Sequence, residues 1–194
     1  KANRGETPED LVPQFKIIRE CVDAFNIPQI EIEGFEADDI IATYCQLAKK
    51  QKIESIIVSS DKDLMQLVNE DTTMLDPMKN KKIGIDQVIE KFGLPPEKVI
   101  QIQALTGDKV DNIPGAPGIG PKTALQLIEE FGDVHSLIKN SSKITQEKRR
   151  NIILDNKDEI LVSLELVKLK KDIKLPLTID NVHTYSSIDT NENL

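Results

Sequence analysis

The sequence predicts an α/β fold, in which a mostly parallel sheet is flanked by helices, followed by a helical region. Strand-like and helix-like segments alternate up to about residue 93, as they do in layered folds whose parallel strands are joined by helices. After "LPP" (94–96) the apolar positions have helical spacing, and turns rich in Gly and Pro separate the segments. We therefore expect an α/β region over 1–94, a helical region over 95–184 and a polar linker over 185–194.

Local patterning predicts each element of the first region. Apolar residues recur at helical spacing in two segments, and "IPQIEIEG" alternates as a strand does. The apolar run "IESIIVSS" is typical of a strand buried on both faces. Asp86 is the expected N-cap of a short helix that ends at Gly93. In chain order the predicted elements are helices at 8–26 and 37–50 with the strand 27–34 between them, a strand at 53–60, a helix opening at 61–68, a strand at 72–77 and a helix at 84–93.

The second region is predicted to be mostly helical. Its helices are expected at 96–107, 121–131, 133–139 and 145–168, with glycines and prolines in the turns between them.

Composition narrows the class of protein. A chain of 194 residues with 39% hydrophobic residues suffices for one domain with a real core. It begins with Lys and shows no signal peptide or membrane-spanning run, so we expect an internal fragment of a longer, cytoplasmic protein. Cys21 and Cys45 stand alone and are expected to be reduced structural thiols.

The net charge of −8 argues against nucleic-acid binding only if acids and bases are evenly mixed. They are not, because bases gather at "KANR" (1–4), "KNKK" (79–82) and "EKRR" (147–150), while acids recur in tight motifs. A basic surface for phosphate groups is therefore compatible with this composition.

Three acidic motifs stand where a ligand site is expected. The first motif, "EADD", opens a helix, the second, "SSDKDL", follows a buried strand, and the third is "TGDKVDNIPG". Each also has a structural reading, as first-turn acids that complement the helix dipole, as an N-cap, or as a turn rich in Asp, Asn and Gly. The seven carboxylates concerned are Glu36, Asp38, Asp39, Asp61, Asp63, Asp108 and Asp111.

These motifs have chemical meaning only if they converge. Two unit charges about 5 Å apart repel by roughly 3 kcal/mol at an effective dielectric of 20, so converging carboxylates require cations or strong pKa shifts. Hard oxygen ligands without His or Cys favour Mg²⁺ or Mn²⁺ over zinc. Two such ions about 4 Å apart are the usual arrangement for phosphodiester hydrolysis by an activated water.

A glycine-rich segment follows the third acidic motif. In "IPGAPGIGPKTALQLIEEFG" (113–132) the glycines permit a tight hairpin, and Pro121 suits the first position of the next helix. Backbone amides of such a hairpin bind phosphate without reading a base. The alternative is a helix corner that uses glycine as a C-cap. The residues predicted to bind DNA are Gly115, Gly118, Ile119, Gly120, Lys122 and Thr123.

Taken together, "KANR", "EADD", "SSDKDLMQLV" and "GDKVDNIPGAPGIGPKTA", in this order, resemble the 5′ nuclease domain of bacterial DNA polymerases, a member of the flap endonuclease family. The resemblance covers essentially all 194 residues. It implies a PIN-like 5′ nuclease fold with a helix–hairpin–helix, and metal-dependent removal of 5′ flaps and 5′-terminal nucleotides from branched or nicked duplex DNA.

The resemblance also implies roles for individual residues. The seven acids match the metal cluster of the family, and Lys1 and Arg4 match the basic pair that engages the scissile phosphate. The hairpin at 115–123 matches the element that grips duplex DNA and holds a K⁺ ion through backbone carbonyls. The family has two further metal-site aspartates upstream of the first residue here, so we expect an N-terminally truncated nuclease whose missing first strand leaves apolar edges exposed.

The resemblance predicts a monomeric nuclease that requires one or two Mg²⁺ or Mn²⁺ ions, binds DNA and continues into polymerase domains. Two alternatives are left open by the residues: a structure-specific DNA-binding fragment without catalysis, and a free-standing flap endonuclease.

Overall fold

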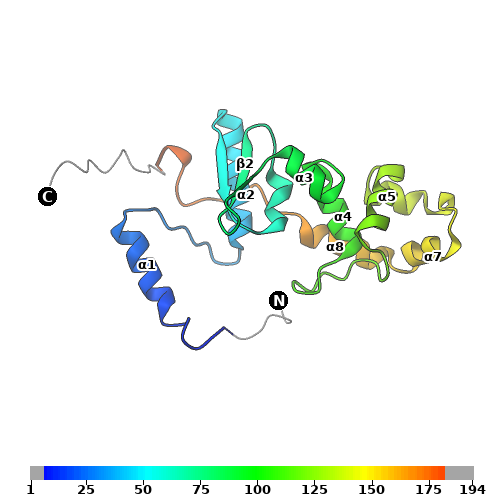
Figure 1. The fold of residues 1–194 in the computed structure, drawn as a ribbon, viewed down its shortest axis with the longest axis horizontal. Coiled ribbons are helices and arrows are strands. Elements are labelled where there is room, and N and C mark those ends of the chain that lie inside the picture. Colours follow the sequence, from blue (N-terminus) through cyan, green and yellow to red (C-terminus); the bar gives the residue numbers. More distant parts are fainter. Residues whose placement is uncertain (1–6, 182–194) are drawn as a thin grey trace.

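The computed structural model describes residues 7–181, which form an α/β part and a helical part (Figure 1). Each part has its own hydrophobic core. Phe92, at the end of the α/β part, packs against both cores and so joins them. Over residues 7–181, no helix has the length and apolar character needed to cross a bilayer.

The α/β part contains a three-stranded sheet in the order β1-β2-β3. Strands β1 (Ser55–Val58) and β2 (Thr72–Asp76) are parallel, with Ile57 opposite Met74, so the predicted parallel pairing is confirmed for them. Strand β3 (Lys81–Ile83) pairs antiparallel with β2 and was not predicted, because three residues starting with two lysines carry no apolar alternation.

Strand β1 lies at one edge of this sheet, and the prediction that it is buried on both faces is wrong for the described chain. Only Ile57 is buried, whereas Ile56 and Val58 are 67% and 63% exposed. Successive side chains of a strand point to opposite faces of the sheet, so these exposures show that the described residues cover the face of Ile57 and leave the face of Ile56 and Val58 open.

The predicted strand at 27–34 is also wrong, because this segment is irregular in the structure. Its alternation of Ile and polar residues is present, but an extended segment becomes a strand only where a neighbouring strand accepts its backbone hydrogen bonds.

The helices of the α/β part are close to the predicted ones, with shifted ends. Helix α1 (Gln14–Ala24) starts later than predicted because Pro13, which has no N–H, stands at its N-cap. It buries none of its residues and lies apart from the sheet (Figure 1). Helix α2 (Ala37–Gln51) confirms the prediction, and the segment after β1 forms the 3-10 helix η1 (Lys62–Leu67).

Helix α3 (Ile85–Phe92) corrects the predicted N-cap. Gly84, not Asp86, occupies that position, because the Gln87 side chain accepts a hydrogen bond from the Gly84 amide at 2.8 Å. Gly93 ends the helix with φ +79°, as predicted.

The helical part follows the prediction with one break. The predicted helix at 145–168 is two helices, α7 (Glu147–Asp155) and α8 (Lys157–Val167). Asn156 separates them, because its side-chain amide donates to the Ile152 carbonyl at 2.8 Å and competes with the helical pattern. The other elements are η2 (Pro96–Lys98), α4 (Val99–Thr106), α5 (Pro121–Phe131), α6 (Val134–Lys139), η3 (Ser141–Lys143) and η4 (Ile179–Asn181).

Hydrogen bonds join the two parts where β1, α4 and α8 end. The Gln66 side chain in η1 donates to the Val167 carbonyl at the end of α8, at 3.0 Å. The Tyr44 hydroxyl in α2 donates to the Leu177 carbonyl at 2.9 Å, so the chain after α8 returns across α2. The ends of these elements therefore frame one region of the molecule.

Candidate functional site

The first acidic motif lies at the start of α2. Glu36 is the N-cap residue, and Asp38 and Asp39 lie in the first turn, where a carboxylate is stabilised by the helix dipole. The apolar residues that follow bury the helix and hold its N-terminus in place, since Ile40 and Ala42 are in the core.

The second motif lies directly beyond the carboxyl end of β1. Asp61 is the N-cap of η1, and its Oδ1 accepts a hydrogen bond from the Asp63 amide at 2.9 Å. The buried side chains Leu64 and Met65 anchor this short helix in the core of the α/β part. The carboxylates of Asp61 and Asp63 thus stand on a rigid support.

The third motif forms a closed turn after α4. Asp108 and Ile113 exchange two backbone hydrogen bonds, of 3.0 and 2.7 Å. Inside this turn the Asp108 Oδ1 accepts a hydrogen bond from the Val110 amide at 2.8 Å. The structural reading of this motif therefore applies as well, because Asp108 stabilises the turn that carries Asp111.

The three motifs border one cavity of about 430 Å³. Six of the seven predicted acids line it: Glu36, Asp38, Asp39, Asp61, Asp63 and Asp111. Asp108 lies instead in an adjoining cavity of about 250 Å³, which it shares with Asp63. Within the described part of the chain, no three Asp, Glu, His or Cys side chains are grouped so that they could hold a metal ion, and metal binding by these acids stays a prediction.

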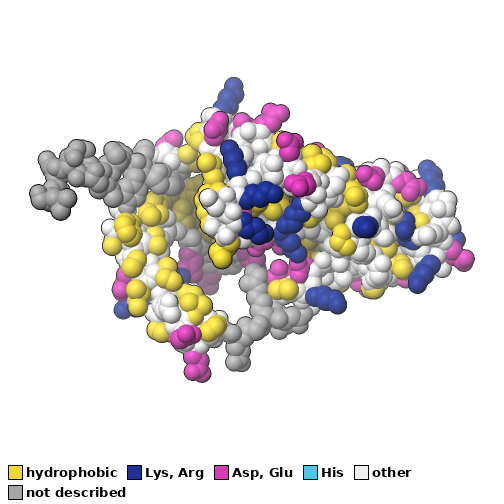
Figure 2. Space-filling view, in the orientation of Figure 1, with side chains coloured by type: hydrophobic (Ala, Val, Ile, Leu, Met, Phe, Trp, Pro, Cys, Tyr) yellow, Lys and Arg dark blue, Asp and Glu magenta, His cyan; other side chains and the backbone are white. Residues whose placement is uncertain are grey.

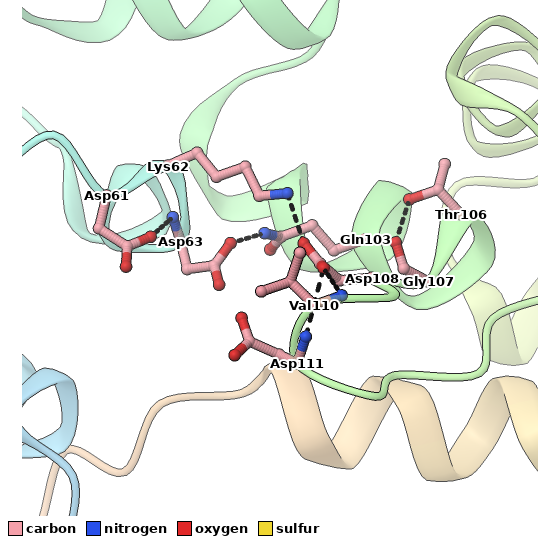
Figure 3. Close-up of polar contacts among 9 residues, drawn as sticks. All are labelled: Asp61, Lys62, Asp63, Gln103, Thr106, Gly107, Asp108, Val110 and Asp111. Carbon is pink, nitrogen blue, oxygen red and sulfur yellow. Dashed lines mark hydrogen bonds and ion pairs between the residues drawn. The ribbon is translucent and has the colours of Figure 1, made fainter. Parts of the chain in front are cut away.

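Lys62 was not predicted as a site residue, yet it bridges two of the acidic motifs (Figure 3). Its Nζ lies 2.6 Å from the Asp108 Oδ2 and forms an ion pair with it. The hydrogen bond from Lys62 lowers the pKa of Asp108, as do the amides of Val110 and Asp111, and the same bond raises the pKa of Lys62. A lysine between two aspartates in "SSDKDL" was the signal for this role.

The environment of Asp63 disfavours its ionised form. Burial raises its pKa, and the negative charge of Asp61 raises it further. Its Oδ1 accepts a hydrogen bond from Gln103 Nε2 in α4 (Figure 3). The Gln103 Oε1 is buried and has no hydrogen-bond partner among the described residues. Gln103 was not predicted as a site residue, because it stands in an ordinary helical pattern.

The segment that ends α8 closes the same cavity. Glu165 and Lys168 line it and form an ion pair at 2.7 Å, and the Lys170 amide donates to the Asp39 Oδ1 at 2.9 Å. These residues were not predicted, because nothing in the spacing of α8 relates it to acids as distant in the sequence as Asp39, 131 positions before Lys170.

The glycine-rich segment connects α4 to α5. Pro121 is the first residue of α5, as predicted. Gly118, Gly120 and Lys122 are exposed, Thr123 is partly buried and Ile119 is in the core. Helix geometry leaves the amides of Lys122 and Thr123 without an intrahelical acceptor, so they face outward from the first turn.

Gly115 differs from the other glycines of this segment. It is buried, its φ is +61°, and its amide donates to the Ser163 Oγ in α8 at 2.9 Å. Gly107 is its close neighbour, since a Cβ on Gly115 would lie 2.7 Å from the Gly107 Cα. The Gly115 amide is therefore used inside the protein, as is the Ile119 amide, which donates to the Ala116 carbonyl at 3.0 Å.

Lys1 and Arg4, the predicted phosphate-binding pair, lie outside the described residues, and so does the predicted linker at 185–194.

The fold and the acidic cavity define a class of protein, a two-part domain in which an α/β part and a helical part border one acidic cavity. The family profile of the "5′-3′ exonuclease, N-terminal resolvase-like domain" matches residues 1–93, and that of the "5′-3′ exonuclease, C-terminal SAM fold" matches residues 94–191. The chain belongs to the 5′-3′ exonuclease family.

Its relatives include polymerases and a shorter exonuclease. DNA polymerase I of Rhizobium leguminosarum is 58% identical over 180 residues, which are 93% of this chain and 18% of that protein. The 5′-3′ exonuclease of Aquifex aeolicus is 37% identical over 182 residues, 94% of this chain and 62% of that protein. The chain thus spans only part of the length of these relatives.

Solved structures share the fold. A bacteriophage T5 flap endonuclease, described as a pseudo-enzyme-product complex with DNA and metal ions, superposes with a TM-score of 0.75 at 25% identity, over 86% of this chain and 62% of that one. The catalytic core of Rad2 in complex with DNA substrate matches with a TM-score of 0.54 at 20% identity, over 86% of this chain and 57% of that one, which shows the fold alone.

Proposed function

We propose that this chain is the 5′ nuclease part of a bacterial DNA polymerase I, and that it hydrolyses phosphodiester bonds in branched or nicked duplex DNA with divalent metal ions. The observation that carries the proposal is the cavity of about 430 Å³, which six predicted acids from three separate segments line. Family membership and the identity of 58% to a DNA polymerase I support it.

The residues at the cavity fit Mg²⁺ or Mn²⁺ by chemistry. The acids that line it are all oxygen donors, and the pKa of Asp63 is raised by burial and further by the charge of Asp61, an effect that a bound cation would oppose. We assign metal binding to Glu36, Asp38, Asp39, Asp61, Asp63, Asp108 and Asp111. When bound, such ions would neutralise the charge of the phosphate and activate a water molecule for attack.

The protein's own residues supply positioning. The η1 cap holds Asp61 against the Asp63 amide, and Gln103 orients the Asp63 carboxylate. Lys62 forms an ion pair with Asp108 in the structure. A divalent ion that binds Asp108 would compete with Lys62 for this carboxylate. Lys1 and Arg4 are proposed to neutralise the scissile phosphate.

The segment between α4 and α5 is proposed to act as a helix–hairpin–helix that grips duplex DNA. Gly118, Gly120, Lys122 and Thr123 offer outward amides, one charge and one hydroxyl to phosphate oxygens. Ile119 is buried beneath them and anchors the hairpin, while Gly115 shapes it. Carbonyls of this hairpin are proposed to hold a K⁺ ion.

We further propose that the chain acts as a monomer in the bacterial cytoplasm, that DNA rather than a membrane is its partner, and that the full-length protein continues into polymerase domains. The domain boundaries proposed are 1–94, 95–184 and 185–194.

Cleavage of a 5′-labelled flap duplex in Mg²⁺, and binding of the same duplex in Ca²⁺, test the nuclease assignment. We expect cleavage in Mg²⁺ only, lost in Asp108→Asn and Asp111→Asn. The matched control is Asp86→Asn, because Asp86 is exposed in the first turn of α3 and lies outside both cavities. Binding without cleavage by the unmodified chain would support the non-catalytic DNA-binding alternative instead.

The hairpin is tested separately by the affinity for uncleaved duplex at several salt concentrations. Removing one phosphate contact, as in Lys122→Gln, should lower the slope of log K against log [salt] by about 0.9. Lys139→Gln, a charge removal at the end of α6, should leave the slope unchanged. Equal slopes for both variants would contradict the hairpin assignment. Replacing K⁺ by tetramethylammonium at equal ionic strength should weaken binding if the hairpin holds K⁺.

A free-standing flap endonuclease remains the second candidate, favoured by the match to the Aquifex aeolicus exonuclease over 62% of that protein. It shares the site and the chemistry proposed above. The length of the natural gene product distinguishes it from a polymerase.

A further inference from the structure

The lysines around the hairpin between β2 and β3 are not used by the proposed site. Lys79 and Lys81 come from the basic motif "KNKK", and Lys91 lies at the end of α3. The three side chains line one cavity of about 340 Å³, which also exposes the Ser60 hydroxyl. Figure 2 shows Lys and Arg side chains gathered on this face, between β2 and α3.

Two acids, Asp76 and Glu90, line the same cavity and offset the charge of this cluster only in part. Lys79 has only a long ion pair with Asp76, at 3.6 Å, and that carboxylate already accepts hydrogen bonds from Ser60 and the Met78 amide. Lys81 lies 4.0 Å from Glu90, and both side chains are largely exposed. Pairs of this kind are weak in water.

Lys91 has no ion pair with a carboxylate in the described part of the chain, and its Nζ lies 5.5 Å from the centroid of the Phe92 ring. Burial lowers its pKa, and the positive charges of Lys62 and Lys79 lower it further. Positive charge therefore accumulates at this place, although the whole chain carries a net charge of −8.

The basic cavity and the acidic cavity each share a lining residue with a third cavity that lies between them. Lys91 lines both the basic cavity and the cavity of about 250 Å³ that contains Lys62 and Asp108. Asp63 lines that second cavity and the acidic cavity of about 430 Å³. A chain of three hollows thus leads from the acids, past Lys62 and Lys91, to the β2–β3 hairpin.

We propose that Lys79, Lys81 and Lys91 form a second phosphate-binding surface, which holds the backbone of a DNA strand as it leaves the acidic cavity. The proposal rests on the proposed nuclease function, because it needs a DNA strand at the acids. Its chemistry is non-specific, since lysines neutralise phosphates without contacting base edges.

The test compares two triple variants of the chain in duplex binding with Ca²⁺. Lys79→Gln/Lys81→Gln/Lys91→Gln removes the proposed contacts. Lys49→Gln/Lys50→Gln/Lys52→Gln removes the same charge at the C-terminal end of α2, about 20 Å along the helix from its acidic first turn. We expect the first triple to lower the salt slope by about 2 to 3 and to weaken binding about tenfold or more, and the second to change neither.

Two further measurements keep the outcome unambiguous. The double variant Lys79→Gln/Lys81→Gln, at two exposed positions, should lower the slope by about 2, with an unchanged melting temperature. The triple Lys→Arg variant should bind as the parent does, because it retains the charge. Equal slopes for the two triple Gln variants would overturn the inference of a second phosphate-binding surface. The proposed nuclease function would still hold in that case if the parent cleaves flaps in Mg²⁺.

Discussion

Asp63 shows the energetic cost of placing one carboxylate of the candidate site close to another. Burial and the charge of Asp61 raise its pKa, while Gln103 and Lys62 act in the opposite direction. Asp108, which lies across the same small cavity, has its pKa lowered by the hydrogen bond from Lys62. The pKa values of these neighbouring carboxylates thus shift in opposite directions, because burial dominates at Asp63 and the hydrogen bond from Lys62 dominates at Asp108.

Asp63→Asn should therefore stabilise the fold. The folded-state pKa of Asp63 lies above its unfolded value of about 3.9, so its ionisation costs stability as pH rises from that value through the folded-state pKa. We expect a gain of less than about 1 kcal/mol at neutral pH, since solvent still screens the group, and no gain at low pH. Thermal melting in EDTA at pH 3 and pH 7 measures this, and a lower melting temperature at pH 7 would refute it.

At the scale of elements, Asp133 is the N-cap of α6. Its carboxylate accepts a hydrogen bond from the Ser136 amide at 2.7 Å, which lowers its pKa. Asp133→Ala should cost about 1 kcal/mol at pH 7. The contribution is present above the unfolded pKa of about 3.9 and is lost as pH falls through the folded-state pKa.

Urea unfolding of Asp133→Ala and of the parent at several pH values measures this difference. Asp10→Ala, at an exposed position in the turns before α1, serves as the control and should have no effect. A difference that persists unchanged at the acid end would show that the cap does not depend on the charge.

The close approach of Gly107 and Gly115 makes the turn between α4 and α5 intolerant of side chains. Gly115→Ala would combine a φ of +61° with backbone contacts to Gly107, so we expect a loss of about 2 to 5 kcal/mol. Gly132→Ala has the same unfavourable sign of φ but open space around it, and should cost about 1 kcal/mol. Equal losses of unfolding free energy for the two variants, measured in urea, would mean that the contact with Gly107 adds no cost to a side chain at Gly115.

Sequence patterning predicted the elements with strong periodicity, such as α2 and α5, and the strand β2. It failed where a distant partner decides the outcome. The segment 27–34 alternates like a strand but pairs with no strand among residues 7–181, and Ile56 and Val58 have the apolar character of core residues but lie on a face of the sheet that the described residues leave open. Periodicity reports the preference of a segment, whereas burial depends on what packs against it.

The candidate site shows the same division. The seven acids stand in motifs of unusual charge density, so the sequence alone singled them out. Lys62 could have been noticed between two aspartates, but Gln103 and the end of α8 reach the site only through the tertiary fold. Residues that act by proximity leave no local pattern.

At the scale of the whole molecule, the crowded acids predict that divalent ions stabilise the chain. A ligand at 100 times its Kd adds about 2.7 kcal/mol, which corresponds to a rise of roughly 5 to 10 °C in melting temperature for a chain of this size. We expect this rise with Mn²⁺ or Mg²⁺ and not with NaCl of equal ionic strength. The variant Asp61→Asn/Asp63→Asn should lose most of it, and an equal rise in that variant would place the ions elsewhere.

One helix touches both halves of the proposed machinery. Ser163 in α8 accepts the hydrogen bond from Gly115 in the hairpin and donates to the Glu159 carbonyl at 2.7 Å, and four residues later the same helix ends at the acidic cavity. A helix is stiff over such a length, about 6 Å. In the proposed function, this stiffness would keep the distance between the gripped duplex and the acids constant, so that each substrate would be cut at the same number of nucleotides from the duplex junction. Ser163→Ala, which removes the hydrogen bond to Gly115, should therefore broaden the range of product lengths on a sequencing gel. Such a result would mean that α8 sets the position of the cut.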